Sequence, residues 1–208
     1  MKVKWLGHSC FSLTTSQGTV VVTDPYDESV GYGRPGVDAH LVTVSHDHHD
    51  HNCLEALGEV GQVAARQEET CVRDVKVIPF ASWHDDAQGK KRGANLIYVI
   101  EADGVRLAHL GDLGHPLSVE QIEALGKLDA LLIPVGGVYT IDGVQAAQLA
   151  LAAGARVTVA MHFMTDKLGF ELMKPEFFLN AMGKKAAYLN EFELDEKTPE
   201  LIVPVLGE

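Results

Sequence analysis

The sequence contains no uninterrupted apolar run of about 18 residues, the length that a membrane-spanning helix requires, so we expect no segment that crosses a bilayer. Residues 1–4, MKVK, lead into a short alternating segment and not into the long apolar stretch of a signal peptide. Cysteine is also scarce: Cys10, Cys53 and Cys71 are odd in number and widely separated, which favours reduced thiols over a disulfide framework. Together these features predict a cytoplasmic protein.

Basic side chains are few relative to acidic ones. Seventeen Lys and Arg residues against 29 Asp and Glu residues give a formal net charge of -12, which repels a phosphate backbone and argues against a long nucleic acid as substrate. The sequence also lacks the G-x-S-x-G motif, which disfavours a serine hydrolase. It contains no repeat, low-complexity tract or long linker, so we expect the 208 residues, of which 46% are hydrophobic, to form a single domain.

The densest group of ionisable side chains follows the apolar segment 41–44. It holds four of the ten histidines in six consecutive imidazole or carboxylate residues: His46, Asp47, His48, His49, Asp50 and His51. Such groups resist dry packing unless a cation or solvent satisfies them, and mixed imidazole and carboxylate ligands suit zinc, manganese or iron. We interpret the H-x-H-x-D-H subset as metal ligands. His49 and Asp47 are expected to face solvent, because they alternate with the ligands.

The predicted secondary structure changes character about halfway along the chain. Short β segments come first, over 3–6, 10–14, 19–23, 41–44, 63–65, 75–79, 95–101 and 105–109. Helices and strands then alternate, with helices over 118–125, 142–153 and 175–182 and strands over 129–134, 156–161 and 201–206. The pattern is compatible with a mixed α/β (α+β) fold but does not by itself establish the architecture.

Three further candidate ligands, His84, Asp112 and His162, lie where later strands end. A sheet fixes the backbone at such points while the loops aim side chains at one position. The order His, His, Asp, His, His, Asp, His therefore predicts one centre built from distant parts of the chain. The choice of His84 stays open at this stage, because His109 and His115 compete for the same role.

The arrangement resembles that of the metallo-β-lactamase-fold hydrolases, in which H-x-H-x-D-H after a hydrophobic strand is followed by a lone His, a Gly-Asp and a final His. Five other segments look like a small prokaryotic branch of that superfamily: GHSCF at 7–11, TDP at 23–25, GAN at 93–95, HLGD at 109–112 and PVGGVYT at 134–140. The similarity extends over nearly the entire chain. It implies a four-layer αββα sandwich with a dinuclear metal site at one edge.

The resemblance also implies a division of the ligands. One metal would be held by His46, His48 and His84, the other by Asp50, His51 and His162, and Asp112 would bridge them. Histidine-rich ligands make zinc the first choice and manganese the second. His48 stands where diiron members of the family carry Glu, so a diiron redox role is not expected.

Two residues outside this set have open roles. Asp24 is expected to orient a ligand histidine by accepting its second N–H, although Asp24-Pro25 can also simply begin a turn. His8 belongs either to the rim of the site or to the structural core.

The implied reaction is hydrolysis of a small ester, lactone or phosphoester by a hydroxide that two metal ions activate. Metal binding lowers the pKa of water from about 16 toward 7. Asp50 is expected to steer the hydroxide and relay its proton, Asp112 to bridge the metals, and Tyr139 to donate a hydrogen bond to a substrate oxygen. The basic run GKKRG at 89–93 is either an anion clamp near the metals or a solvated hairpin tip, so an anionic small molecule is one option for the substrate.

Two other functions use the same residues. A metal-dependent phosphodiesterase or small nuclease would share every ligand, whereas a non-catalytic metal-binding module would bind metal without turnover. A bridging Asp112 has no role in a mononuclear structural site, which weighs against the second alternative.

Overall fold

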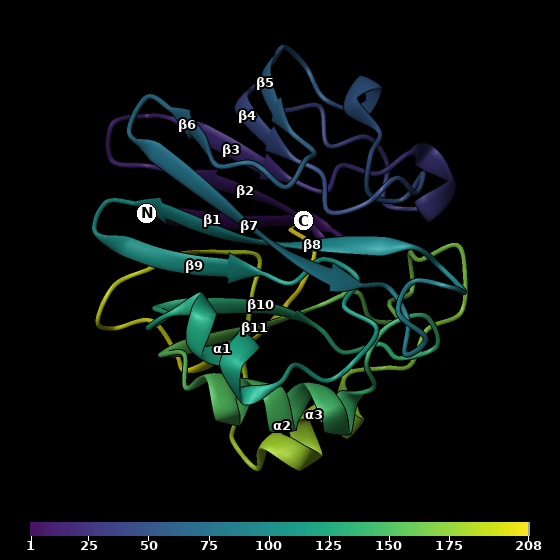
Figure 1. Cartoon of the computed structure of the whole chain (residues 1–208). Helices are drawn as coiled ribbons and strands as arrows, with labels where there is room; N and C mark the ends of the chain where they lie inside the picture. The colour runs from purple at the N-terminus through teal and green to yellow at the C-terminus, as the bar shows by residue number, and fades with distance from the viewer. Residues whose placement is uncertain (208) are drawn as a thin grey trace.

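The computed structural model describes residues 1–207, and these form two β-sheets that pack face to face (Figure 1). The first sheet has six strands in the order β13 (Glu191–Glu193), β1 (Lys2–Gly7), β2 (Cys10–Thr14), β3 (Val20–Thr23), β4 (Ala39–Thr43) and β5 (Val60–Ala64). The second has eight strands in the order β12 (Ala187–Leu189), β14 (Leu201–Pro204), β11 (Val157–Met161), β10 (Ala130–Pro134), β9 (Val105–His109), β8 (Ala94–Ala102), β7 (Val75–Trp83) and β6 (Thr70–Val72). The mixed α/β sandwich that the family resemblance implied is confirmed.

The α-helices gather on one side of the molecule. Within residues 1–207 the chain forms α1 (Val119–Leu125), α2 (Gly143–Ala153) and α3 (Glu176–Met182), which lie together beyond the eight-stranded sheet (Figure 1). α2 packs on β10 and on α3. None of the helices in this described part of the chain is long and apolar enough to span a membrane.

The outer face of the six-stranded sheet is covered differently. Successive strand residues alternate between two apolar clusters: Phe11 and Leu41 pack between the sheets, whereas Cys10 and Val42 face the other way. The second cluster is completed by irregular segments and by the 3-10 helices η1 (Glu28–Val30) and η2 (Leu54–Ala56). This outer layer of the sandwich therefore consists of two short 3-10 helices and irregular loops.

The elements follow from local sequence signals. Asp142 accepts hydrogen bonds from the backbone N–H groups of Val144 (2.9 Å) and Gln145 (2.8 Å) at the start of α2, and Gly154 ends the helix with φ of 60°. The predicted end of a strand at residue 79 was too early, since β7 continues to Trp83. β6 pairs only with residues 75–77 of β7, so Pro79 faces no strand on that side and its missing N–H is tolerated.

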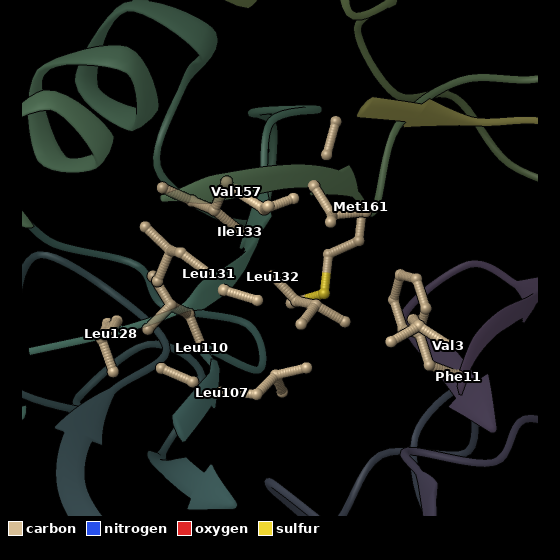
Figure 2. Close-up of a cluster of buried hydrophobic side chains, with 14 of the residues drawn as sticks. Val3, Phe11, Leu107, Leu110, Leu128, Leu131, Leu132, Ile133, Val157 and Met161 are labelled. Carbon is tan, nitrogen blue, oxygen red and sulfur yellow. The ribbon is translucent and has the colours of Figure 1, made fainter. Parts of the chain in front are cut away.

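The central strands of the larger sheet are buried on both faces. Every residue of β10 and β11 is buried, because α2 covers one face and the six-stranded sheet the other. Figure 2 shows Leu131, Ile133 and Met161 within this core, with Phe11 reaching it from the first sheet. Such a rigid framework fixes the positions at which the loops leave the strands.

Candidate metal centre

Four loops at one edge of the sandwich bring the predicted ligands together. The loop after β4 carries four of them, His84 follows β7, Asp112 follows β9 and His162 follows β11. These residues form the metal-side cluster, which consists of His46, His48, Asp50, His51, His84, Asp112 and His162. All of the sequence-predicted metal residues thus lie within one region of the structure.

Three imidazoles form a first group within this cluster. One ring nitrogen from each of His46, His48 and His84 lies within 4.8 Å of the others. The ring centroid of His46 lies 4.5 Å from that of His48 and 4.7 Å from that of His84. This set is the one that the resemblance assigns to the first metal.

A second group contains one residue more than the sequence predicted. Ligand atoms of His8, Asp50, His51 and His162 all lie within 4.8 Å of one another. Asp50 Oδ2 is 3.5 Å from His51 Nε2 and 3.3 Å from His8 Nε2. Three of these four residues are the predicted ligands of the second metal, and His8 is the addition.

Asp112 lies between the two groups. Its Oδ2 is 3.1 Å from His162 Nε2 and 3.2 Å from His51 Nε2 in the second group. The same oxygen is 3.4 Å from His84 Nε2 and 3.9 Å from His46 Nε2 in the first. Burial acts to raise the pKa of Asp112, but His162 and His51 outweigh it and hold the pKa well below its usual value. An ionised carboxylate therefore faces both sets of imidazoles.

The donor atoms of the cluster fit cations. His46 Nε2, His51 Nε2 and Asp112 Oδ1 are buried and make no hydrogen bond within the described residues. The 3.2 Å approach of His51 Nε2 to Asp112 Oδ2 is close but is not aligned as a hydrogen bond. Buried polar atoms are normally paired, and imidazole and carboxylate groups that converge without pairing are suited to binding divalent metal.

The protonation states of the imidazoles point the same way. Burial, with a further contribution from His51, lowers the pKa of His46 to about 3, and burial lowers the pKa of His84 to about 4. Both rings are therefore neutral at physiological pH, which is the form that coordinates metal. His51 differs: burial acts to lower its pKa, but Asp112 and Asp50 outweigh it and raise the pKa well above the usual value. The same carboxylates attract any positive charge at this position.

Comparisons with known proteins identify the family of the chain. A family model described as Beta-lactamase superfamily domain matches residues 2–162. A UPF0173 protein from Pyrococcus furiosus is 30% identical over an alignment that covers 91% of this chain and 94% of the relative. The chain belongs to the metallo-β-lactamase superfamily. A UPF0173 metal-dependent hydrolase from Thermococcus onnurineus is 27% identical, with 89% of this chain and 94% of the relative covered. The crystal structure of a superfamily member from Thermotoga maritima is 35% identical, covers 98% of this chain and 97% of its own, and superimposes with a TM-score of 0.80.

In this metallo-β-lactamase-fold chain, Asp24 contacts both groups of ligands through a short network. Its carboxylate accepts hydrogen bonds from Ser45 N (2.8 Å) and Ser45 Oγ (2.5 Å), and its Oδ2 lies 2.9 Å from His51 Nδ1. Ser45 Oγ in turn lies 2.9 Å from His46 Nδ1. Asp24 therefore lies beside Nδ1 of His51, the ring nitrogen that an orienting carboxylate would have to contact.

The two competitors of His84 lie outside the cluster. His109 Nε2 is 2.8 Å from the carbonyl oxygen of Ser9, and its Nδ1 accepts a hydrogen bond from Gly111 N. His115 Nε2 accepts from Trp83 N, and its Nδ1 is 2.8 Å from the carbonyl oxygen of Pro116. Both rings use their nitrogens on the backbone, so His84 is the residue that the structure places with His46 and His48.

The two remaining polar residues of the loop face solvent, as expected. The His49 side chain is 65% exposed. Asp47 is exposed and accepts a hydrogen bond from Asn52 Nδ2 at 2.6 Å. The alternation of ligand and solvent-facing residues therefore continues past the end of β4.

His8 is the residue whose position the sequence left undecided. It lies in the turn between β1 and β2 with φ of 52°, is fully buried, and neither of its ring nitrogens has a hydrogen-bond partner among the described residues. Its ring centroid is 4.3 Å from that of His162. The available signal was a polar Gly-His-Ser turn between two apolar strands, but nothing local indicates that this turn reaches the end of β11.

Asn95 is a supporting residue that the sequence analysis quoted within the GAN segment at 93–95 but to which it assigned no role. Its side-chain nitrogen donates to Ser82 Oγ (2.7 Å) and to the carbonyl oxygen of Leu110 (3.0 Å), and its Oδ1 accepts from Asp112 N (2.9 Å). A Cβ at Gly111 would lie 2.4 Å from Asn95 Oδ1, so this close packing depends on glycine. Together they fix the backbone that presents Asp112.

A cavity of about 510 Å³ opens above the cluster. It is lined by His48, His49, Asp50, His84, Arg92, Asp112, Tyr139, His162 and Phe170. The volume is within the usual range for a small-molecule site. Tyr139 lies at the cavity with its side chain partly exposed, which is compatible with the contact to substrate predicted for it.

Proposed function

We propose that this protein is a hydrolase in which two divalent cations activate water for attack on a small ester, lactone or phosphoester. The coarser statement, that the chain is a metal-dependent hydrolase of the metallo-β-lactamase fold, follows from its family and from relatives that carry that name. The observation that carries the dinuclear proposal is the position of Asp112. One of its oxygens lies within 3.9 Å of imidazole nitrogens from both groups.

The residues divide into two ligand sets in this proposal. The first cation is assigned to His46, His48 and His84, the second to Asp50, His51 and His162, and Asp112 is assigned to both. Bound divalent cations would lower the pKa of water toward 7 and polarise the bond under attack. Zinc is the proposed metal and manganese the alternative, because imidazole donors predominate. The Thermotoga maritima relative is described as a candidate Zn-dependent hydrolase, which supports this choice.

Two side chains are assigned to the attacking water and the substrate. Burial acts to raise the pKa of Asp50, but His51 and His8 outweigh it, so the carboxylate stays ionised. Its lone pairs are then available to accept a hydrogen bond from the attacking water and to orient it. Tyr139, which lines the same cavity, is assigned to donate a hydrogen bond to a substrate oxygen.

Metal analysis tests the centre directly. Protein purified without chelator and loaded with zinc is expected to hold two equivalents per chain, and Asp112→Ala is expected to lose metal and hydrolytic turnover together. His48→Ala should behave in the same way. His49→Ala is the matched control, because it removes a neighbouring imidazole that is 65% exposed, and it should retain both properties. Equal losses in the His48 and His49 variants would refute the ligand assignment.

A phosphodiesterase or small nuclease is the second candidate, and the guanidinium of Arg92 in the cavity lining favours it. Parallel assays of metal-loaded protein with bis(4-nitrophenyl) phosphate, simple lactones and aryl esters separate the two activities. High-affinity metal binding with no turnover in any assay would instead indicate a non-catalytic module.

We also propose a small-molecule substrate and a cytoplasmic location. The net charge of -12 opposes binding of a long nucleic acid. The three cysteines, Cys10, Cys53 and Cys71, are all free thiols in the structure, which suits a reducing compartment.

A further inference from the structure

The cavity over the metal-side cluster has one basic residue in its wall. Arg92, from the segment between β7 and β8, lines this cavity together with Tyr139, Phe170 and the ligand histidines. The guanidinium carbon of Arg92 lies 5.4 Å from the centroid of the Tyr139 ring, within the range of a cation–π contact. A charged, planar hydrogen-bond donor is therefore held beside the proposed reaction site.

Five of the other 16 Lys and Arg residues in this acidic chain have carboxylate partners. Lys2, Lys76, Lys91, Arg106 and Lys184 each pair with a carboxylate. Arg92 has no carboxylate within 4.0 Å among the described residues. Its five N–H donors are thus free for an anion that enters the cavity.

The backbone around Arg92 is fixed by one buried carboxylate. Asp85 accepts hydrogen bonds from the backbone N–H groups of Ala87 (2.7 Å), Gly89 (2.9 Å), Lys91 (2.9 Å) and Arg92 (2.8 Å). These four bonds curl residues 85–92 into a compact loop. An anchored backbone reduces the entropy that Arg92 would lose when it binds a ligand.

A second cavity of about 370 Å³ adjoins the first and shares two residues with it, His48 and Arg92. Its lining adds Arg66, which is exposed and also has no carboxylate partner among the described residues, and Gln67. The two cavities therefore meet at His48 and Arg92, and an arginine contributes to the wall of each. A substrate that places its reactive bond at the metal-side cluster can extend an acidic group in this direction.

We propose that Arg92 binds a carboxylate or phosphate group carried by the substrate, so that the hydrolase acts on small anionic esters or lactones. This inference rests on the proposed function, because it assigns a substrate class to the same site. Arg92 supplies the paired donors that match a carboxylate or phosphate, and Tyr139 holds the guanidinium through its ring. Phe170 supplies the apolar part of the wall.

Two aryl esters that differ at the far end of the chain, in a carboxylate or its uncharged methyl ester, test the proposal through the release of 4-nitrophenolate. 4-Nitrophenyl hydrogen adipate carries a free carboxylate, and its methyl ester has the same scissile bond without that charge. A hydrogen bond to a charged group changes binding by roughly 10- to 100-fold, so zinc-loaded wild type should prefer the acid by about that factor in kcat/KM. Arg92→Gln should reduce this preference by about 10-fold or more, mainly through KM. Arg92→Lys should keep part of it.

Lys90→Gln is the matched control. Lys90 lies in the same loop and loses the same charge, but it is exposed and does not line the cavity. The preference of the Lys90→Gln variant for the acid should stay within about twofold of the wild-type preference. An equal loss in the two glutamine variants would indicate only a general field effect and would overturn the assignment. Loss of turnover on both esters alike in Arg92→Gln would also overturn it, since it would indicate a structural role.

A binding measurement separates this proposal from the hydrolase proposal. Calorimetric titration of zinc-loaded protein with adipate, and separately with inorganic phosphate, is compared for wild type, Arg92→Gln and Lys90→Gln. Weaker binding only in Arg92→Gln supports the anion site even where no ester is hydrolysed, and the stronger of the two anions identifies its chemistry. Unchanged binding in Arg92→Gln overturns the anion site, even where ester hydrolysis is observed.

Discussion

Replacement of Asp24 by Asn tests how the protein sets the tautomer of a ligand histidine. Asp24 Oδ2 lies 2.9 Å from His51 Nδ1, and the opposite ring nitrogen, Nε2, faces Asp112 at 3.2 Å. An Asn side chain whose oxygen stays on Ser45 N would direct its NH₂ group at His51 Nδ1. That nitrogen would then have to accept, and the ring proton would move to Nε2, where it blocks the lone pair that faces the site.

The expected magnitude follows from this change in hydrogen bonding. Loss of the outer partner of a metal ligand typically weakens metal binding by roughly 10- to 100-fold. That range corresponds to about 1.4 to 2.8 kcal/mol. We expect Asp24→Asn to lie near the upper end, because it removes an acceptor and also favours the wrong tautomer. The first group should be affected less, because Asp24 contacts His46 only through Ser45 Oγ.

Competition with a chromophoric zinc chelator measures both equivalents in one titration. Asp129→Asn is the control, because Asp129 also accepts a backbone hydrogen bond, from Arg106 N at 2.9 Å, but belongs to a different part of the fold. The control should bind zinc as wild type does, while Asp24→Asn should hold one equivalent about 100-fold more weakly. Wild-type affinity for both equivalents in Asp24→Asn, with a native circular dichroism spectrum, would refute the tautomer argument.

Two further predictions concern residues on either side of the cavity. His8→Ala should weaken the second zinc equivalent by about 10-fold in the same titration, because it removes a buried imidazole 3.3 Å from Asp50 Oδ2. His40→Ala should have no effect, because His40 lies in β4, where its Nδ1 accepts a hydrogen bond from Val20 N, and does not line the cavity. Asp85→Asn should make stability less dependent on pH. Burial acts to raise the pKa of Asp85, but the N–H groups of Arg92 and Ala87 outweigh it and hold the pKa at about 2, below the ordinary value of 3.8 for an aspartate. The stabilisation is therefore present above pH 3.8 and lost as the pH falls through about 2, so urea unfolding at pH 5 and pH 2 should show a larger decline for wild type. An identical decline in the variant would contradict the assignment.

The sequence was sufficient for most of the helices and strands because their signals are local, whereas the sandwich arrangement was implied only by the family resemblance. β10 and β11 are recognisable as apolar runs, and the ends of α2 are encoded by a capping Asp142 and a terminal Gly154. β6, β12 and β13, each of three residues, were not predicted. Their sequences have no extended alternation, and each exists because a longer strand lies beside it. Pairing of this kind is a property of the folded chain and not of the segment.

The candidate site divides in the same way. The ligands in the loop after β4 are adjacent in sequence, so their spacing alone indicated a metal site. His84, His109 and His115 could not be separated by local pattern, because the distinction depends on what their ring nitrogens meet. His109 Nε2 lies 2.8 Å from the carbonyl oxygen of Ser9, a hundred positions away in the sequence. This contact rules out His109 as a ligand. The position of His8 near His162 is equally non-local.

The three basic residues of the run at 89–93 have different surroundings in the structure, because one carboxylate, Asp85, fixes the backbone of the loop. The run can be a solvated tip or an anion clamp, and its three charges look equivalent along the chain. Four backbone bonds to Asp85 curl the loop so that Arg92 lines the cavity, while Lys91 pairs with Asp86 at 2.6 Å and Lys90 is exposed. Lys90 thus has the exposure expected of a solvated tip, and Arg92 has the position that the proposed anion site requires. Asp85 holds the loop through backbone N–H groups and not through the side chains of the run. Substitutions at 90 and 91 should therefore leave the position of Arg92 unchanged, whereas a substitution at 85 should move it.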